Sequence, residues 1–150
     1  MDTESDSGRR IAFVCVRNAG RSQMATAYAE REKADRGLED LEIVTGGTHP
    51  ADDVHEVVAE AMAEEGFDLS DRTPQEVSTE TLETCDRVAT MGCSTLELDA
   101  GVDVRDWDLP DPGEENLERV REIREEVRER VSALFDELES EGTVEAEHEG

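Results

Sequence analysis

Residues 11–22 read IAFVCVRNAGRS, and this stretch decides the fold. Its first half, residues 11–16, is a continuous apolar run, which is typical of a strand covered on both faces. Its second half is a polar loop that contains Gly20, and a helical pattern starts at about Ser22. A buried strand that passes through a short loop into a helix is the repeating unit of an α/β sheet. The sequence therefore predicts an α/β protein built around this strand.

The rest of the chain alternates strands and helices in the same way. Short connections with right-handed crossovers predict a four-stranded parallel sheet with helices on both faces, a three-layer sandwich. Gly37 ends the first expected helix, and the glycines at 46 and 47 end the second expected strand. We expect helices over residues 22–35, 53–66 and 114–138, and further strands over 41–44, 87–91 and 102–107.

The two ends of the chain differ from its middle. Residues 1–8 and 139–150 are polar, acidic and poor in apolar side chains, so both are expected to be disordered tails. Residues 9–138 are about the size of one domain, large enough to bury a core. We therefore expect one catalytic domain between two acidic tails.

The charge of the chain is strongly negative. Acidic residues number 41 and basic residues 15, which gives a net charge of −26. Such a surface repels phosphate backbones, so nucleic acid is not an expected partner. An acidic interaction protein remains an alternative, but the acids are spread along the whole chain. That spread favours adaptation to high salt, where screening removes the self-repulsion, and predicts a looser fold in dilute buffer.

The sequence also indicates where the protein is located and which cofactors are not expected. No stretch approaches the roughly 20 apolar residues that span a membrane, and the acidic N-terminus does not resemble a secretory signal. We therefore expect a soluble, cytoplasmic protein with no membrane partner. Cys15, Cys85 and Cys93 form neither a disulfide framework nor a C-x-x-C motif, and the histidines add no ligand pattern. No metal and no cofactor are expected.

The loop after the first strand has the spacing C-x5-R, from Cys15 to Arg21. A loop between a strand and a helix N-terminus points several amides at one spot, and the helix dipole adds positive potential there. Arg21 can close such a cradle around two oxygens of a tetrahedral anion. The same field favours the thiolate of Cys15 as a nucleophile. A buried structural cysteine beside an arginine ion pair is the alternative. The expected oxyanion-binding residues are Val16, Arg17, Asn18, Ala19, Gly20, Arg21 and Ser22.

Two residues of this loop have more specific expected roles. Ser22 could donate a hydrogen bond to the Cys15 sulfur. Asn18 could brace the loop, because asparagine bonds nearby backbone and tolerates left-handed geometry.

Besides the C-x5-R spacing, five segments form a further pattern: RSQMA at 21–25, GTHPA at 47–51, DLSDR at 68–72, TMGC at 90–93 and DWDLPDP at 106–112. With these segments, the chain resembles, from about Ile11 to Leu138, the low-molecular-weight protein tyrosine phosphatase superfamily, and within it the thioredoxin-coupled arsenate reductases. The resemblance implies a flavodoxin-like, phosphotyrosine phosphatase I-like fold. It also implies that the aspartate of the Asp-Pro pair, Asp111, is the general acid. Chemistry alone leaves Asp106 and Asp108 as rivals, because any nearby carboxylic acid can protonate the leaving oxygen.

An arsenate reductase needs a second thiol to resolve the cysteine–arsenic intermediate. Cys93 follows the third expected strand and would share a rim of the sheet with Cys15, if the first and third strands are neighbours. Cys85 should lie near the opposite rim as a small core residue. The family's further cysteine is absent from residues 94–99. Two routes therefore stay open: thioredoxin or a small thiol reduces a Cys15–Cys93 disulfide, or an external thiol resolves the intermediate directly.

Three functions follow, in order of preference. The first is arsenate reduction with Cys15, Arg21, Asp111 and Cys93. The second is hydrolysis of phosphotyrosine or small phosphoesters without Cys93. The third is an oxyanion-binding or redox-sensing module without turnover. The scarcity of aromatic residues counts against phosphotyrosine, because Trp107 is the only plausible wall for its ring.

Overall fold

The structure is a computed structural model that describes residues 10–38, 41–69, 72–91, 103–107, 109 and 115–149, with side chains as far as Glu139. No helix in this described part is long and apolar enough to cross a membrane. The elements in chain order are β1 (Arg10–Cys15), α2 (Arg21–Arg36), β2 (Glu42–Gly47), α3 (Glu56–Ala63), α4 (Thr79–Glu83), β3 (Arg87–Met91), β4 (Asp103–Asp106) and α5 (Leu117–Glu149).

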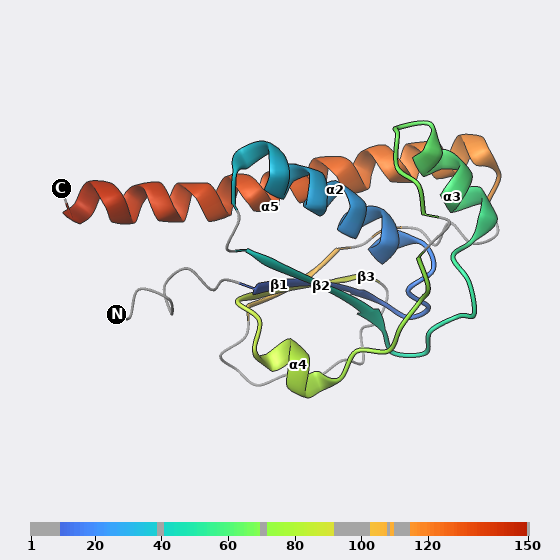
Figure 1. The fold of residues 1–150 in the computed structure, drawn as a ribbon, viewed down its shortest axis with the longest axis horizontal. Helices are drawn as coiled ribbons and strands as arrows, with labels where there is room; N and C mark the ends of the chain where they lie inside the picture. The colour runs from blue at the N-terminus through green and yellow to red at the C-terminus, as the bar shows by residue number, and fades with distance from the viewer. Residues whose placement is uncertain are drawn as a thin grey trace.

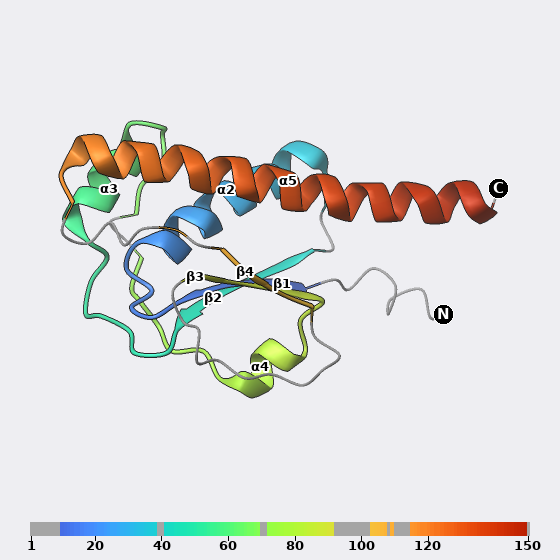
Figure 2. The same ribbon diagram turned by 180° about the vertical axis from the view of Figure 1, so that it is seen from behind.

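The four strands form one parallel sheet in the order β2-β1-β3-β4. Helices α2, α3 and α5 cover one face and the short α4 lies on the other, as Figure 1 shows and Figure 2 shows from behind. The predicted three-layer α/β architecture is confirmed. In the central strand β1, Cys15 is level with Gly47 of β2 and Met91 of β3. The condition that the first and third strands are neighbours is therefore met.

The alternation of side chains along β1 divides the core. Ile11, Phe13 and Cys15 belong to the large cluster under α2, α3 and α5, whereas Ala12 and Val14 belong to a smaller cluster. This is the period of two expected for a strand with both faces covered. Cys85 lies in the smaller cluster, just before β3 begins, and its burial raises the pKa of its thiol. It is thus a core residue near the rim opposite Cys15, as predicted.

Several boundaries differ from the sequence-based expectation. β3 has the predicted bounds, but β2 continues through the two glycines because both pair with β1. α3 begins at Glu56 rather than residue 53, and α4 was not predicted. α5 continues to Glu149, past the expected end at residue 138, so the predicted helix was too short. The apolar stripe that marked that end has Leu138 as its last residue, whereas a helix needs no apolar stripe to continue, and glutamate, which recurs five times over residues 139–149, has a high helix propensity.

Candidate active site

Cys15 is the last residue of β1 and stands at the carboxyl edge of the sheet, where open α/β sheets bind their ligands. Only 2% of the residue is exposed. The loop 16–20 leads from it directly into α2, whose N-cap is Gly20, without a side-chain cap. The N-terminus of α2, where a helix favours an anion, therefore lies beside the sulfur. The strand, loop and helix predicted around the C-x5-R spacing are all present.

Two hydrogen-bonding groups contact the Cys15 sulfur. The Asn18 amide donates to Sγ at 3.2 Å, and Ser22 Oγ lies 2.9 Å from Sγ. Asn18 Nδ2 donates to Ser22 Oγ at 2.7 Å, which leaves the serine hydroxyl hydrogen free to point at the sulfur. Donors at these positions stabilise a thiolate. The predicted contact between Ser22 and the sulfur is confirmed.

Asn18 is the brace of the loop, as predicted. Its backbone is left-handed, with φ of 52°, and the residue is fully buried. Its Nδ2 also donates to Thr45 Oγ1 at 3.0 Å. Its Oδ1 accepts from the Gln75 amide at 3.0 Å and from Gln23 Nε2 at 3.1 Å. One side chain therefore ties the loop to β2, α2 and the segment before α4.

The loop directs its carbonyls away from its interior. The carbonyl of Val16 accepts from the His49 amide at 2.8 Å, that of Arg17 from Ala51 at 2.9 Å, and that of Ala19 from His55 at 3.0 Å. By contrast, the amides of Arg17, Ala19 and Gly20 donate to no hydrogen bond within the described residues. Unpaired amides next to a helix N-terminus form an anion-binding site. This geometry fits the predicted oxyanion cradle.

The Arg21 side chain connects the loop to the segment that follows β4. Its Nη1 donates to the Leu109 carbonyl at 2.9 Å. Leu109 stands two residues before Asp111 in the sequence. Asp111 and Cys93 both lie outside the described residues, as does Asp108. The remaining rival acid, Asp106, accepts a hydrogen bond from Thr90 Oγ1 at 3.2 Å. Its carboxylate is thus already engaged within the sheet.

The sequence reasoning missed four residues that support the loop: Gln23, Thr45, Gly47 and Gln75. Gly47 does so by having no side chain, because a Cβ there would lie 2.6 Å from the Val16 carbonyl oxygen and 3.0 Å from the Asn18 amide. From the sequence, Gly47 is assigned to the end of a strand and to a segment that matches the family, but not to a close approach of the loop. Its position level with the expected nucleophile was the signal that could have revealed the close approach.

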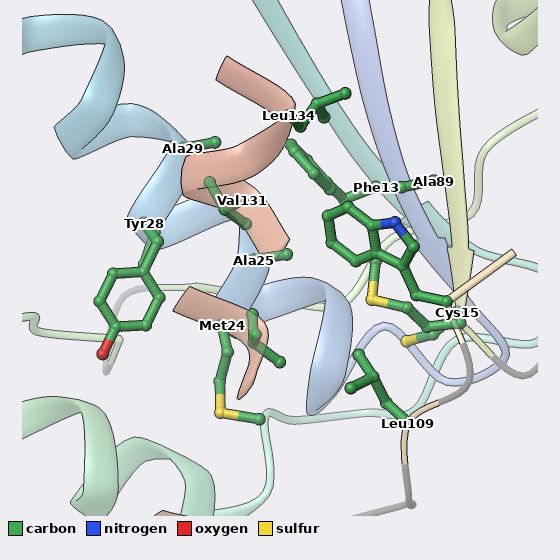
Figure 3. Close-up of a cluster of buried hydrophobic side chains, with 14 of the residues drawn as sticks. Phe13, Cys15, Met24, Ala25, Tyr28, Ala29, Ala89, Leu109, Val131 and Leu134 are labelled. Carbon is green, nitrogen blue, oxygen red and sulfur yellow. The ribbon is translucent and has the colours of Figure 1, made fainter. Parts of the chain in front are cut away.

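No aromatic side chain is free to flank a substrate ring. Trp107 is 8% exposed and packs against Phe13, with ring centroids 5.8 Å apart. Phe67 lies edge-on to Tyr28 and under the Arg31 guanidinium. All five aromatic residues of the chain are described, and none is exposed. Figure 3 shows Cys15 and Leu109 on one side of the apolar cluster and Tyr28 on the other. The core thus takes up the ring of Trp107, the only residue that the sequence offered as a plausible wall, which agrees with the argument against phosphotyrosine.

The family model described as low molecular weight phosphotyrosine protein phosphatase matches residues 10–144. The match covers most of the 150 residues, and the chain belongs to this family of enzymes.

Within the family, the chain is similar to arsenate reductases. A Halobacterium salinarum protein with the provisional name arsenate reductase is 67% identical over 136 residues, 89% of this chain and 96% of that protein. The solved structure of the Corynebacterium glutamicum thioredoxin-dependent arsenate reductase has a TM-score of 0.74 and 30% identity, over 89% of this chain and 63% of that longer chain. An arsenate reductase in the phosphate binding state has a TM-score of 0.73 and 28% identity, over 86% and 98%. The resemblance predicted from the sequence is confirmed.

Proposed function

We propose that this chain is an arsenate reductase that uses Cys15 as its nucleophile. One observation carries the proposal: the buried Cys15 sulfur accepts a hydrogen bond from Asn18, in a loop whose Arg17, Ala19 and Gly20 amides donate to no acceptor in the described part of the chain. That arrangement suits attack on a tetrahedral oxyanion held directly above the sulfur. The similarity to proteins named arsenate reductase supports the choice of anion.

In the first step, the Cys15 thiolate attacks arsenic, and an arsenic–oxygen bond breaks. Asp111 protonates the departing oxygen, which leaves as water, and a Cys15–arsenate adduct remains. The amides of loop 16–22 and the Arg21 guanidinium hold the negative charge. The bond from Arg21 to Leu109 supports this assignment, because it holds the chain two residues before Asp111 against the loop.

In the second step, the Cys93 thiolate attacks the Cys15 sulfur. The electron pair of the sulfur–arsenic bond stays with arsenic, which leaves as arsenite, and a Cys15–Cys93 disulfide forms. Met91 is level with Cys15 on the neighbouring strand. Two residues of chain reach at most about 7 Å, so Cys93 is within modest loop movement of disulfide distance. Thioredoxin or a small thiol then supplies the two electrons that reopen the disulfide. In the other route, such a thiol attacks the adduct directly.

Phosphoester hydrolysis is the second candidate, because the family model describes phosphatases. The same Cys15, Arg21 and Asp111 would form and hydrolyse a phosphocysteine without Cys93. Four of the five aromatic side chains are buried, and the half-buried Phe67 packs under the Arg31 guanidinium, which counts against phosphotyrosine as the substrate. A small phosphoester would need no such wall.

A paired assay in multimolar salt separates these functions. It measures arsenate-dependent oxidation of a dithiol and hydrolysis of an aryl phosphate by the same preparation. We expect Cys15→Ser to abolish both activities and Cys93→Ser to abolish only the first. Cys85→Ser is the matched control, since Cys85 lies in the other core cluster, and it should retain both. Arsenate reduction that survives Cys93→Ser would contradict the resolving role, and activity that survives Cys15→Ser would overturn the whole scheme.

A further inference from the structure

Arg17 is the exposed residue of a loop whose other residues are buried or half-buried. Cys15, Asn18 and Ala19 are each 2% exposed or less, whereas the Arg17 side chain faces solvent. Its backbone is fixed on both sides, by the bond from the Ala51 amide to its own carbonyl and by the bond from the Asn18 amide to the Cys15 sulfur. A flexible cationic side chain therefore starts from a rigid point two residues from the nucleophile.

The charge of Arg17 has no partner within the described residues. It forms no ion pair and no side-chain hydrogen bond there. Other arginines of the described part are heavily engaged; Arg36, for example, pairs with three carboxylates and lies over the Phe135 ring. Acidic residues outnumber basic ones by 41 to 15, and Asp52 and Asp53 directly follow Ala51. An exposed arginine that stays unpaired in such surroundings is available to an external anion.

We propose that the Arg17 side chain is a second cationic contact for the oxyanion, at the mouth of the loop, in addition to Arg21 at its end. This inference rests on the proposed function, because it assumes that the loop is an oxyanion site. The loop amides can bind the oxygens that point toward the protein, and Arg17 can bind an oxygen that points toward solvent. Arg17 is then a positioning residue that sets affinity for arsenate and phosphate, distinct from the role of its own amide.

The dependence of anion binding on salt concentration distinguishes a direct contact between Arg17 and the oxyanion from long-range attraction. A chain with net charge −26 repels anions, and one exposed arginine would offset little of that field at a distance. At about 1 M salt the screening length falls to roughly 3 Å, so only groups in contact still interact appreciably. The proposal is the contact. The effect of Arg17 should therefore weaken as salt rises, but it should persist in multimolar salt.

The test measures the dissociation constant of inorganic phosphate by calorimetry, and kcat and KM for arsenate, at 0.2 M and 2 M KCl. The variants are Arg17→Gln, Arg17→Lys and the control Arg119→Gln, which makes the same charge change on α5. We expect Arg17→Gln to raise the phosphate dissociation constant and KM about tenfold at low salt, with kcat within about twofold, because one charge-assisted hydrogen bond is lost. About threefold should remain at 2 M, and lysine should restore most of the binding.

The outcomes separate this inference from the proposed function. Equal phosphate affinities for Arg17→Gln and Arg119→Gln would overturn the role of Arg17, even in an active arsenate reductase. An effect that disappears at 2 M KCl would overturn the contact and leave only long-range attraction. Loss of kcat with unchanged phosphate binding would also overturn it. If the wild-type chain reduces no arsenate but Arg17→Gln still weakens phosphate binding, the proposed function fails and the inference stands.

Discussion

Around Asn18 the polar side chains that bond to one another are neutral, whereas around Arg124 they are charged. The first group, the Asn18 network, consists of Asn18, Ser22, Gln23, Thr45 and Gln75. The second, the Arg124 cluster, consists of Arg124, Arg121, Glu64, Glu65 and Glu125 and joins α3 to α5. Asn18, Ser22 and Gln23 are at most 1% exposed, while the Glu64 side chain is 33% exposed.

The difference follows from what each group has to do. The Asn18 network fixes a loop around a thiolate, and neutral amides and hydroxyls do so without adding a charge that would compete with the anion. The Arg124 cluster fixes two helices, with Arg124 Nη1 also bonded to the Ala61 carbonyl at 2.7 Å. Hydrogen bonds from Arg121 and Arg124 lower the pKa of Glu64 to about 2, so this carboxylate stays ionised down to acidic pH. The ion pairs of the Arg124 cluster thus lie where solvent still reaches the glutamates.

The largest expected effect comes from placing a negative charge in the neutral Asn18 network. Asn18→Asp keeps the shape and the acceptor for the Gln75 amide, but it removes the donor to Ser22 and Thr45 and puts a negative charge beside the sulfur. We expect kcat/KM to fall at least about a hundredfold, because both the thiolate and the bound anion are disfavoured. Asn116→Asp, at the exposed start of α5, makes the same change outside the Asn18 network. Equal activities of the two variants would show that neutrality around Asn18 is unimportant.

The next test adds a methyl group where the loop meets β2. Gly47→Ala places a Cβ against the Val16 carbonyl and the Asn18 amide, so the backbone of the loop must shift. Because small displacements in a catalytic loop have large effects, we expect kcat to fall by about one to two orders of magnitude. Gly37→Ala is the control: its added Cβ meets nothing, and its positive φ of 68° should reduce stability by about 1 kcal/mol with activity retained. Measured kcat values decide, and full activity of Gly47→Ala would contradict the close approach.

Removing a charge from the Arg124 cluster should act on stability alone. Arg124→Met leaves the Ala61 carbonyl and Glu64 without a buried partner. We expect a loss of about 2 kcal/mol in the free energy of unfolding, less than for a fully buried pair because solvent reaches Glu64. Arg121→Met removes a more exposed partner of the same glutamate and should cost less. Denaturant unfolding measures both variants, and kcat should stay at the wild-type value. A loss of activity with Arg124→Met would mean that the two clusters are coupled.

The sequence predicted the parts of the molecule whose signal is local. β1 and β3 are short apolar runs, and the loop between β1 and α2 has a recognisable spacing. Asn18 could be assigned as a brace because left-handed geometry is a property of the residue type. Asp111 and Cys93 depended on the family resemblance, since aspartate is abundant and a loop cysteine is unremarkable by itself.

The features that the sequence did not predict depend on contacts between segments that are distant along the chain. Gly47, Thr45 and Gln75 support the loop from segments far along the chain, and nothing in their immediate neighbours marks them. The helix α4 has five residues, too few for an apolar period, and it begins at a Ser78 cap that bonds the Thr81 amide. Such residues meet their partners only when the chain folds.

The smallest expected effect concerns Tyr28, a polar group that belongs to neither cluster. It is 2% exposed, and its hydroxyl has no hydrogen-bond partner within the described residues. Tyr28→Phe should therefore change the free energy of unfolding by less than about 1 kcal/mol at pH 7, because no hydrogen bond is lost. Burial raises the pKa of Tyr28 from 10.0 to about 12, with Glu65 adding to the shift. The unfolded chain then ionises first, so Tyr28 should lower stability as pH rises from about 10 to about 12. Thermal unfolding of both proteins between pH 7 and 11.5 in high salt would show a shallower alkaline decline for Tyr28→Phe, and parallel curves would contradict the burial of this hydroxyl.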